Sequence, residues 1–380
     1  MRKLRIGQIG TGEISKIHAL SFATIPDVEI AAVADPDKQR ARRHAARFGV
    51  KMVFDDFRKM LHKAEVDVVS LSLPNYLHGP IGIECLEAGK HVICEKPLCL
   101  TLADADAMIR AAKKSRRVLA YAEELCFIPK YVKMKRIADS GALGGIMHIY
   151  QIEEHGGAYS PWFFGKQTSG GGIMMDMACH AIEFCRWFLG KPKVKAVTAR
   201  AATLQLDRAE LRRRKLAPGK DWEPVDDRVE VLIDFANGQQ ATAVSGWVRQ
   251  GGMISIAEVL GTKGRAKADL LGQGMGLEVY SDIGIPSDYP NDTSKNKGWS
   301  FPEYEWLWEN GYPQEMRNFV NAMLGREPLV ESGEDGKVVL QIMLAAYHSA
   351  GVGKRVAFPF TPPADLKYPV DLWLHPRRNL

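Results

Sequence analysis

The sequence predicts an α/β protein: a doubly wound parallel sheet, followed by an α+β domain with a large, mainly antiparallel open sheet. Short, almost continuously apolar runs alternate with helical segments in the first part, and a glycine-rich turn joins the first run to the first helix. From about residue 123, strand-like runs follow one another across tight turns. The 380 residues exceed what one hydrophobic core usually supports, so we predict two domains, residues 1–122 and 123–380.

The first apolar run, LRIGQIG, leads into Gly10 and Gly12, and the segment EISKIHALSFA after them is predicted to be a helix. Glycines between a strand and a helix let a pyrophosphate approach the backbone at the helix N-terminus. Ser15 stands where a third glycine is usual, and serine is small enough for close packing of helix on strand. This turn predicts a dinucleotide site.

The second apolar run, VEIAAVAD, ends in Asp35. An acid about 20 residues after the glycines accepts the ribose hydroxyls of NAD and repels the 2′-phosphate of NADP. The sequence therefore predicts NAD, although Lys38 and Arg40 nearby weaken that preference. The alternative is that Asp35 only begins a turn with Pro36.

Polar residues also follow the next two apolar runs, VDVVSLSLP and HVICEKP. Ligands of parallel sheets bind at the carboxyl ends of the strands, which is where these residues lie. Lys96 directly precedes Pro97, and we predict a cis peptide bond between them that directs the lysine into the cleft. For His78, a solvated loop position remains an alternative. The predicted cofactor contacts are Gly10, Gly12, Glu13, Ile14, Asp35, Leu73, Pro74, Asn75, His78, Glu95 and Lys96.

The second domain contains two hairpin signals. Asn237 and Gly238 separate two strand-like runs in DRVEVLIDFANGQQATAVSGWV, and ISIAEVLGTKGRAKADL repeats the scheme with another glycine turn. A sheet of this kind needs a cover on its apolar face, either helices such as 173–189 or another subunit.

The segment SGGGIMMDMACH places Asp176 and His180 four residues apart in an apolar helix that is predicted to end at Gly190. Each would cost several kcal/mol if buried without a partner, so we expect contact with each other, a cofactor or a polar substrate. A purely structural pair and a metal site formed by His180 and Glu183 are the alternatives. A dinucleotide site in the same chain favours catalysis, and no metal is predicted.

Taken together, these segments resemble the Gfo/Idh/MocA oxidoreductases, the family of glucose-fructose oxidoreductase and inositol dehydrogenase. The resemblance covers nearly the whole chain and rests on IGQIGTGEISKIH, VADPD, PNYLHGPIGIECLEAGKHVICEKPL, SGALGGIMHI and GGGIMMDMACHAIEFCRWFLG. It implies a Rossmann domain, a catalytic set of Lys96, Asp176 and His180, and an open sheet that packs in a homodimer or homotetramer. Residues 125–129, LCFIP, depart from the N-R-F-x-P of many relatives, so the substrate contact of that arginine is not expected here.

Oxidation of an alcohol with NAD requires a hydride acceptor and a base for the hydroxyl proton. His180 suits the second task, Asp176 could orient it or bind the substrate, and Lys96 could stabilise the alkoxide. The predicted substrate is a sugar, glycoside or cyclic polyol with a secondary hydroxyl. Its predicted contacts are Lys96, Tyr159, Trp162, Asp176 and His180.

The aromatic stretch 299–308 could belong to the pocket, to a core or to a subunit interface. Two other functions stay open. One is cleavage of a glycosidic bond by transient oxidation with tightly bound NAD, and the other is a non-enzymatic dinucleotide-binding sensor.

The composition limits the partners. Apolar residues make up 46% and charged residues 25% of the chain, no apolar run is long enough to cross a bilayer, and the N-terminus lacks a signal-peptide pattern. The 51 basic and 45 acidic residues give +6, and the basic run 212–215 reads as a solvated face, so no nucleic acid is expected. The six cysteines form no CxxC pair, which indicates buried thiols and a cytoplasmic protein.

Overall fold

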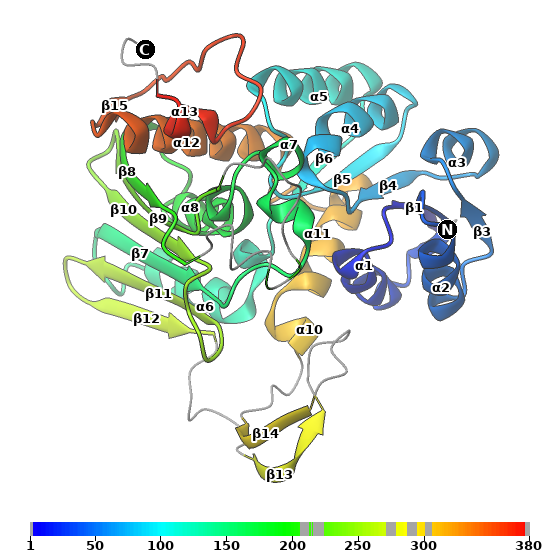
Figure 1. Ribbon diagram of the computed structural model, residues 1–380, viewed down its shortest axis with the longest axis horizontal. Coiled ribbons are helices and arrows are strands. Elements are labelled where there is room, and N and C mark those ends of the chain that lie inside the picture. Colours follow the sequence, from blue (N-terminus) through cyan, green and yellow to red (C-terminus); the bar gives the residue numbers. More distant parts are fainter. Residues whose placement is uncertain are drawn as a thin grey trace.

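The computed structural model contains two large β-sheets, with helices between and around them (Figure 1). It describes residues 3–205, 213, 215, 224–270 and 306–376, and the backbone of the strands 279–286 and 295–300. Figure 1 shows the first sheet and its helices, blue to cyan, on the right and the second sheet, mostly green, on the left.

The first sheet is six-stranded and wholly parallel, in the order β3-β2-β1-β4-β5-β6. The strands are β1 (Leu4–Ile9), β2 (Val28–Ala34), β3 (Met52–Phe54), β4 (Val68–Leu71), β5 (His91–Glu95) and β6 (Leu119–Ala122). This order confirms the predicted doubly wound sheet. The strand order reverses between β1 and β4, and the carboxyl ends of the strands at such a point form a crevice that binds ligands.

Helices link these strands: α1 (Glu13–Ala23), α2 (Lys38–Phe48), α3 (Phe57–Lys63), α4 (His78–Glu87) and α5 (Leu102–Ser115). Helix α1 covers the predicted segment EISKIHALSFA and begins after Gly12, where no side chain caps it. The first N–H groups of α1 therefore have no side-chain cap to accept them.

The second sheet has seven strands in the order β12-β11-β7-β10-β9-β8-β15. The strands are β7 (Ile146–Glu154), β8 (Val194–Ala202), β9 (Arg228–Phe235), β10 (Gln240–Gly246), β11 (Ile254–Gly261), β12 (Arg265–Asp269) and β15 (Val356–Ala357). Neighbours are antiparallel except β7 and β10, which are parallel. Both hairpins predicted from the sequence, β9–β10 and β11–β12, are confirmed.

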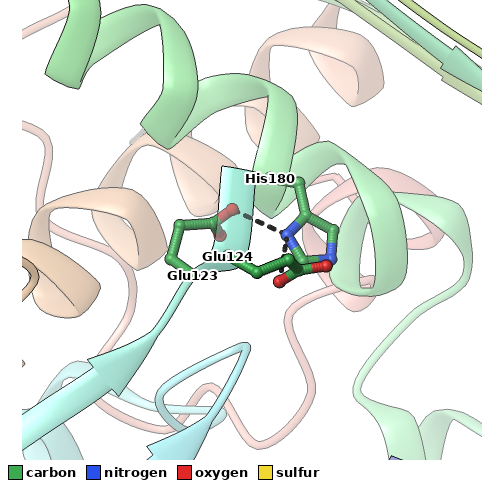
Figure 2. A group of neighbouring side chains, drawn as sticks. All are labelled: Glu123, Glu124 and His180. Carbon is green, nitrogen blue, oxygen red and sulfur yellow. Dashed lines mark hydrogen bonds and ion pairs between the residues drawn. The ribbon is translucent and has the colours of Figure 1, made fainter. Parts of the chain in front are cut away.

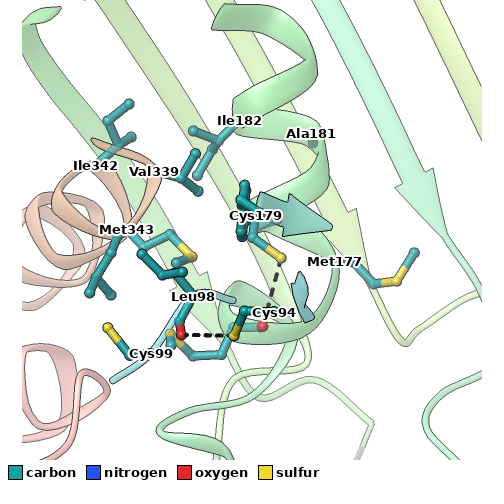
Figure 3. Close-up of a cluster of buried hydrophobic side chains, with 14 of the residues drawn as sticks. Cys94, Leu98, Cys99, Met177, Cys179, Ala181, Ile182, Val339, Ile342 and Met343 are labelled. Carbon is teal, nitrogen blue, oxygen red and sulfur yellow. Dashed lines mark hydrogen bonds between the residues drawn. The ribbon is translucent and has the colours of Figure 1, made fainter. Parts of the chain in front are cut away.

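Two helices cover the inner face of this sheet, α8 (Cys179–Phe188) and α12 (Gly333–Val352). Figure 3 shows side chains of both helices packed with residues that end or follow β5, in one buried apolar cluster. The prediction that the helix 173–189 covers the sheet is thus confirmed.

Helix α11 (Tyr312–Met323) packs on α1 and places Met316, Phe319 and Val320 in a buried cluster with Ile6 and Phe22. A helix late in the chain therefore completes the core of the first sheet. The boundary that we predict at residues 122 and 123 falls between β6 and the 3₁₀ segment η2 (Glu124–Phe127).

The remaining elements lie between or after those already named. They are η1 (Asn75–Leu77), α6 (Pro129–Asp139), η3 (Pro161–Phe164), α7 (Lys166–Ser169), the π-helical turn η4 (Met174–Ala178), β13 (Val279–Pro286), β14 (Lys295–Ser300), α10 (Trp306–Glu309) and α13 (Asp371–Leu374).

All six cysteines are free and buried, as predicted. Within the described chain, no helix combines the length and apolar character needed to cross a bilayer. Of the aromatic stretch 299–308, Phe301, Tyr304 and the side chain of Trp299 lie outside the described residues, as does Arg212 of the basic run.

Candidate active site

A cavity of about 730 Å³ lies where the carboxyl ends of β4, β5 and β6 meet the start of the α8 helix. Among the predicted site residues, those that line it are Glu13, Ile14, Leu73, Asn75, Glu95, Lys96, Tyr159, Trp162, Asp176 and His180. One cavity thus brings together the predicted catalytic set, the predicted substrate contacts and six of the predicted cofactor contacts.

The glycine turn lies just outside this cavity and fits a dinucleotide. Gly10 has a φ of +85°, and a Cβ there would lie 2.1 Å from the carbonyl oxygen of Ser72. Gly12 has no atom within 4 Å of the place of a Cβ, at the uncapped start of α1. Open space at the N-terminus of a helix suits a diphosphate, so these residues would hold the diphosphate of NAD.

Asp35 directly follows β2 and is buried. Its described hydrogen bonds come from Thr11, Asp37 and Arg40. Its Oδ2 accepts from the Thr11 N–H at 2.9 Å and the Thr11 hydroxyl at 2.8 Å, and its Oδ1 accepts from the Asp37 N–H at 2.9 Å. Arg40 donates to both oxygens, at 3.0 and 2.7 Å. Burial opposes ionisation, but Arg40 and the other donors lower the pKa of Asp35. Asp35 is therefore a carboxylate with both oxygens already engaged.

His78 is buried, so the solvated alternative is wrong. Its ring nitrogens lie 2.8 Å from the carbonyl oxygens of Pro97 and Leu73, and burial lowers its pKa. Pro74 also lies away from the cavity lining, whereas Asn75 lines it and donates to the carbonyl of Ser169 at 2.9 Å. His78 and Asn75 therefore fix the loop after β4 in place.

Lys96 enters the cavity from the end of β5, and its peptide bond to Pro97 is cis, as predicted. Its Nζ donates to the carbonyl oxygen of Asp176 at 2.7 Å and to Oδ1 of Asp176 at 3.1 Å. Burial lowers the pKa of Lys96, but Asp176 and the weaker contributions of Glu124 and Glu95 together raise it well above its usual value. Lys96 is thus a fixed ammonium.

Asp176 is held from two sides, because the indole Nε1 of the buried Trp247 donates to its Oδ2 at 3.1 Å. Burial raises the pKa of Asp176, yet Lys96 holds it below its usual value. Asp176 therefore remains a carboxylate whose two oxygens each have a donor.

The predicted helix after the glycines is present, but its first turn is π-helical. Asp226 fixes the start of this turn by accepting from the N–H groups of Gly172 at 3.0 Å and Met174 at 2.8 Å. A Cβ at Gly172 would lie 1.8 Å from the Asp226 carbonyl oxygen, which explains the glycine. The wider π turn takes Asp176 and His180 out of the α-helical spacing, and no hydrogen bond joins them.

His180 contacts two acids that directly follow β6 (Figure 2). Its Nδ1 lies 2.7 Å from Oε1 of Glu123 and 3.6 Å from Oε2 of Glu124. Its Nε2 has no hydrogen-bond partner among the described residues, and His180 lines the cavity. One ring nitrogen is thus fixed by a buried carboxylate and the other is available to a ligand.

Glu123, Glu124, Glu153 and Trp247 are site residues that were not predicted from the sequence. A signal for the first two was present, because EE follows the apolar run VLAYA just as EK follows HVIC. Applying the rule for the carboxyl ends of strands to β6 as well would have found them. The positions of Glu153 and Trp247 at the site depend on how the strands of the second sheet pair, and no local sequence pattern indicates that pairing.

Aromatic rings form one wall of the cavity. Trp162 stacks on Phe163 with centroids 3.8 Å apart, and Tyr159 meets the edge of Phe163 at 5.7 Å. From the second aromatic stretch, Trp306 lines the cavity and Trp308 does not.

The alternative of a metal held by His180 and Glu183 does not match the geometry. Both oxygens of Glu183 accept from Arg186, at 2.6 and 2.8 Å, whereas Nδ1 of His180 contacts Glu123. The two residues belong to separate charged clusters in the described chain.

Comparison with known proteins agrees with this geometry. Residues 4–123 match the model described as "Oxidoreductase family, NAD-binding Rossmann fold", and residues 131–267 match the C-terminal domain model of the same family. The chain belongs to the Gfo/Idh/MocA oxidoreductase family. It is an NAD-dependent oxidoreductase, which decides against the non-enzymatic sensor.

Three relatives illustrate the similarity. The chain is 30% identical to a myo-inositol 2-dehydrogenase of Thermotoga maritima, over 91% of this chain and 96% of the relative. It is 28% identical to a D-glucoside 3-dehydrogenase of Escherichia coli, over 93% and 97%. The crystal structure of GenD2 from gentamicin A biosynthesis, in complex with NAD, is 33% identical with a TM-score of 0.85, and the match covers 95% of this chain and 97% of GenD2.

Proposed function

We propose that this oxidoreductase is a dehydrogenase that oxidises a secondary hydroxyl of a sugar, glycoside or cyclic polyol. The observation that carries the proposal is the convergence of Lys96 and His180 on one cavity at the carboxyl edge of an NAD-binding sheet. The relatives named myo-inositol 2-dehydrogenase and D-glucoside 3-dehydrogenase support a polyhydroxylated substrate.

NAD, when bound, supplies the hydride acceptor for this reaction. Lys96 supplies a donor for the substrate oxygen that loses its proton. Because its pKa is raised, Lys96 remains an ammonium at neutral pH, and a fixed positive charge stabilises the negative charge that develops on that oxygen. Asp176 positions Lys96 through its carbonyl and its carboxylate.

His180 takes the hydroxyl proton on Nε2. Glu123 orients the ring through Nδ1, and it stabilises the imidazolium that forms when Nε2 accepts a proton. Burial and the neighbouring Glu183 raise the pKa of Glu123 well above its usual value. This basic carboxyl is a strong acceptor for the Nδ1–H of His180, which leaves Nε2 as the nitrogen that takes the hydroxyl proton.

A substrate screen tests the proposal. The purified protein with NAD is offered sugars, glycosides and inositols, and NADH formation is followed by absorbance. We expect one chemical class to give NADH. The rival function, cleavage of a glycosidic bond with tightly bound NAD(H), would release sugar without net NADH. A protein that binds NAD but neither reduces it nor cleaves any member of the panel contradicts both.

We further propose that the enzyme is a homodimer or homotetramer that packs through the outer face of the second sheet. Tyr150 and Leu232 are exposed there, beside the half-buried Val244 and Ile256 on neighbouring strands. Apolar side chains on the open face of a sheet indicate an interface. Light scattering after gel filtration should give an oligomer, and Leu232→Glu should shift it toward the monomer.

We also propose a cytoplasmic location, which six free, buried thiols support. Fractionation of the producing cell, with detection of the native protein, tests this location.

A further inference from the structure

The charges of the cavity carry an inference about the substrate. Three of its acids have fixed cationic or imidazole partners: Glu13 pairs with Lys16 at 2.7 Å, Glu95 with His18 at 2.8 Å, and Asp176 with Lys96 at 3.1 Å. Two further acids line the same cavity, Glu124 and Glu153. No lysine or arginine pairs with either of them in the described chain.

Glu153 lies near the end of β7 with its side chain on the inner face of the sheet, and only 3% of the residue is exposed. Its Oε2 has no hydrogen-bond partner among the described residues. A buried carboxylate without a partner is unfavourable by several kcal/mol. Glu153 therefore suits a ligand that brings a hydrogen-bond donor or a positive charge. Burial, reinforced by Glu124 and Glu123, raises its pKa to about 7.

Glu124 adds to the negative charge. It accepts from the Tyr312 hydroxyl at 3.3 Å and lies 3.6 Å from Nδ1 of His180. Behind it lie Glu123 and Glu315, each with one buried oxygen that lacks a partner among the described residues. Among the described basic groups, His180 acts most strongly on these acids, and Lys96, which is bound to Asp176, acts on them less.

We propose that the substrate carries an ammonium group, which Glu153 and Glu124 bind, and that it is therefore an amino sugar or an amino-substituted cyclitol or glycoside. An ammonium would give the orphan oxygen of Glu153 its missing donor and offset the excess negative charge of the cavity. The aromatic wall of Trp162 and Tyr159 suits the C–H face of the same ring. This inference rests on the proposed dehydrogenase function.

Matched substrates test it. Methyl glycosides are compared in sets that differ at one carbon: hydroxyl, free amine or N-acetyl amine, which keeps the nitrogen without the charge. At neutral pH we expect kcat/KM for one free amine to exceed that of its hydroxyl counterpart by about 10- to 100-fold, the range for a charge-assisted hydrogen bond. The N-acetyl compound should lose this advantage.

A pair of variants locates the effect. Glu153→Gln should reduce the preference for the amine by about tenfold or more. Glu154→Gln is the matched control, because Glu154 lies next in the chain, faces Arg228 at 3.4 Å and does not line the cavity. The control should keep the preference. Melting temperatures verify that both variants fold, and titration of the enzyme–NADH complex with each amine measures binding separately from turnover.

Equal kcat/KM for the amine and hydroxyl compounds overturns the inference and leaves the proposed function standing, since a neutral polyol is then oxidised. Binding of Mg²⁺, Ca²⁺ or Zn²⁺ alone that is lost in Glu153→Gln also overturns it, because a metal ion is then the missing partner. Failure to oxidise any compound of the sets, with no amine bound, overturns the dehydrogenase proposal itself.

Discussion

Two clusters of buried charges meet at helix α8, and they differ in whether a polar atom stays open to a cavity. The cavity cluster, at the start of the helix, consists of Lys96, Glu123, Glu124, Asp176 and His180. The core cluster, at the end of the helix, consists of Glu183, Arg186, Lys191, Glu331 and Asp335. Both contain three acids, and both have the geometry of a group of three ligands.

In the core cluster, the charges face one another. Arg186 donates to both oxygens of Glu183, at 2.6 and 2.8 Å, and also bonds Asp335. Lys191 lies 2.9 Å from Asp335 and 3.1 Å from Glu331. Burial and Glu183 raise the pKa of Glu331 well above its usual value, so two cations and one retained proton balance three acids. No member of this cluster lines the cavity.

The cavity cluster has the same kinds of residue but leaves Nε2 of His180 open to the cavity. Burial, charge and ligand-like spacing therefore do not by themselves identify a catalytic site. What does so is a proton-accepting atom that is fixed on one side and faces a cavity on the other. The predictions below test this distinction.

The largest effect is expected for His180→Ala. Loss of a general base should lower kcat by about 10²- to 10⁴-fold, while the affinity for NAD stays nearly unchanged because the glycine turn and Asp35 lie elsewhere. Single-turnover measurements on the purified variant, with its melting temperature alongside, check both parts. A variant of normal turnover but low stability would place His180 with the core cluster.

For Arg186→Met the opposite result is expected. Without the guanidinium, Glu183 and Asp335 stay buried but lose the positive charge that pairs with them. Breaking a buried charge pair destabilises a protein by about 3–5 kcal/mol. Urea unfolding should show this loss, whereas kcat and KM of the protein that stays folded should be close to normal. A drop in kcat as large as that of His180→Ala would contradict the purely structural role of the core cluster.

Glu123→Gln should give a smaller loss. The amide keeps a hydrogen-bond acceptor for Nδ1 but removes the charge that stabilises the imidazolium, an effect of about 10- to 100-fold in kcat. Removing the negative charge also makes the pair easier to deprotonate, so the acidic limb of kcat/KM should move to lower pH. A pH profile with an unmoved limb would limit Glu123 to a structural role. Asp335→Asn, in the core cluster, is the matched control and should leave the limb in place, because Asp335 contacts Arg186 and Lys191 rather than Glu123.

Much of this arrangement could be predicted from the sequence, because its signals are local. The glycine turn, Asp35, the lysine before Pro97 and the apolar helix with Asp176 and His180 each follow from neighbouring residues. Contacts between distant segments could not be predicted in this way. That Asp176 meets Trp247, and His180 meets Glu123, depends on a π-helical turn and on how two sheets meet. The four-residue spacing predicted one shared face, and the wider turn gave each side chain its own partner.

Asp35 lies at a proposed ligand site, yet its oxygens are engaged like those of the core cluster, so it provides the mildest test of the comparison. Arg40 donates to both oxygens of this carboxylate, and its side chain is 46% exposed, so we expect Arg40 to shift when a ribose hydroxyl bonds Asp35. We expect the unaltered enzyme to bind NAD better than NADP. Asp35→Ser should narrow that difference by about tenfold or less, because the repulsive charge is gone and Arg40 becomes available to a 2′-phosphate. Titration of both cofactors measures the ratio, and the double variant Asp35→Ser, Arg40→Ala should lose the gain in NADP affinity. An unchanged ratio in Asp35→Ser would mean that Asp35 serves only to hold Thr11 and Arg40 in place, as the acids of the core cluster hold Arg186 and Lys191.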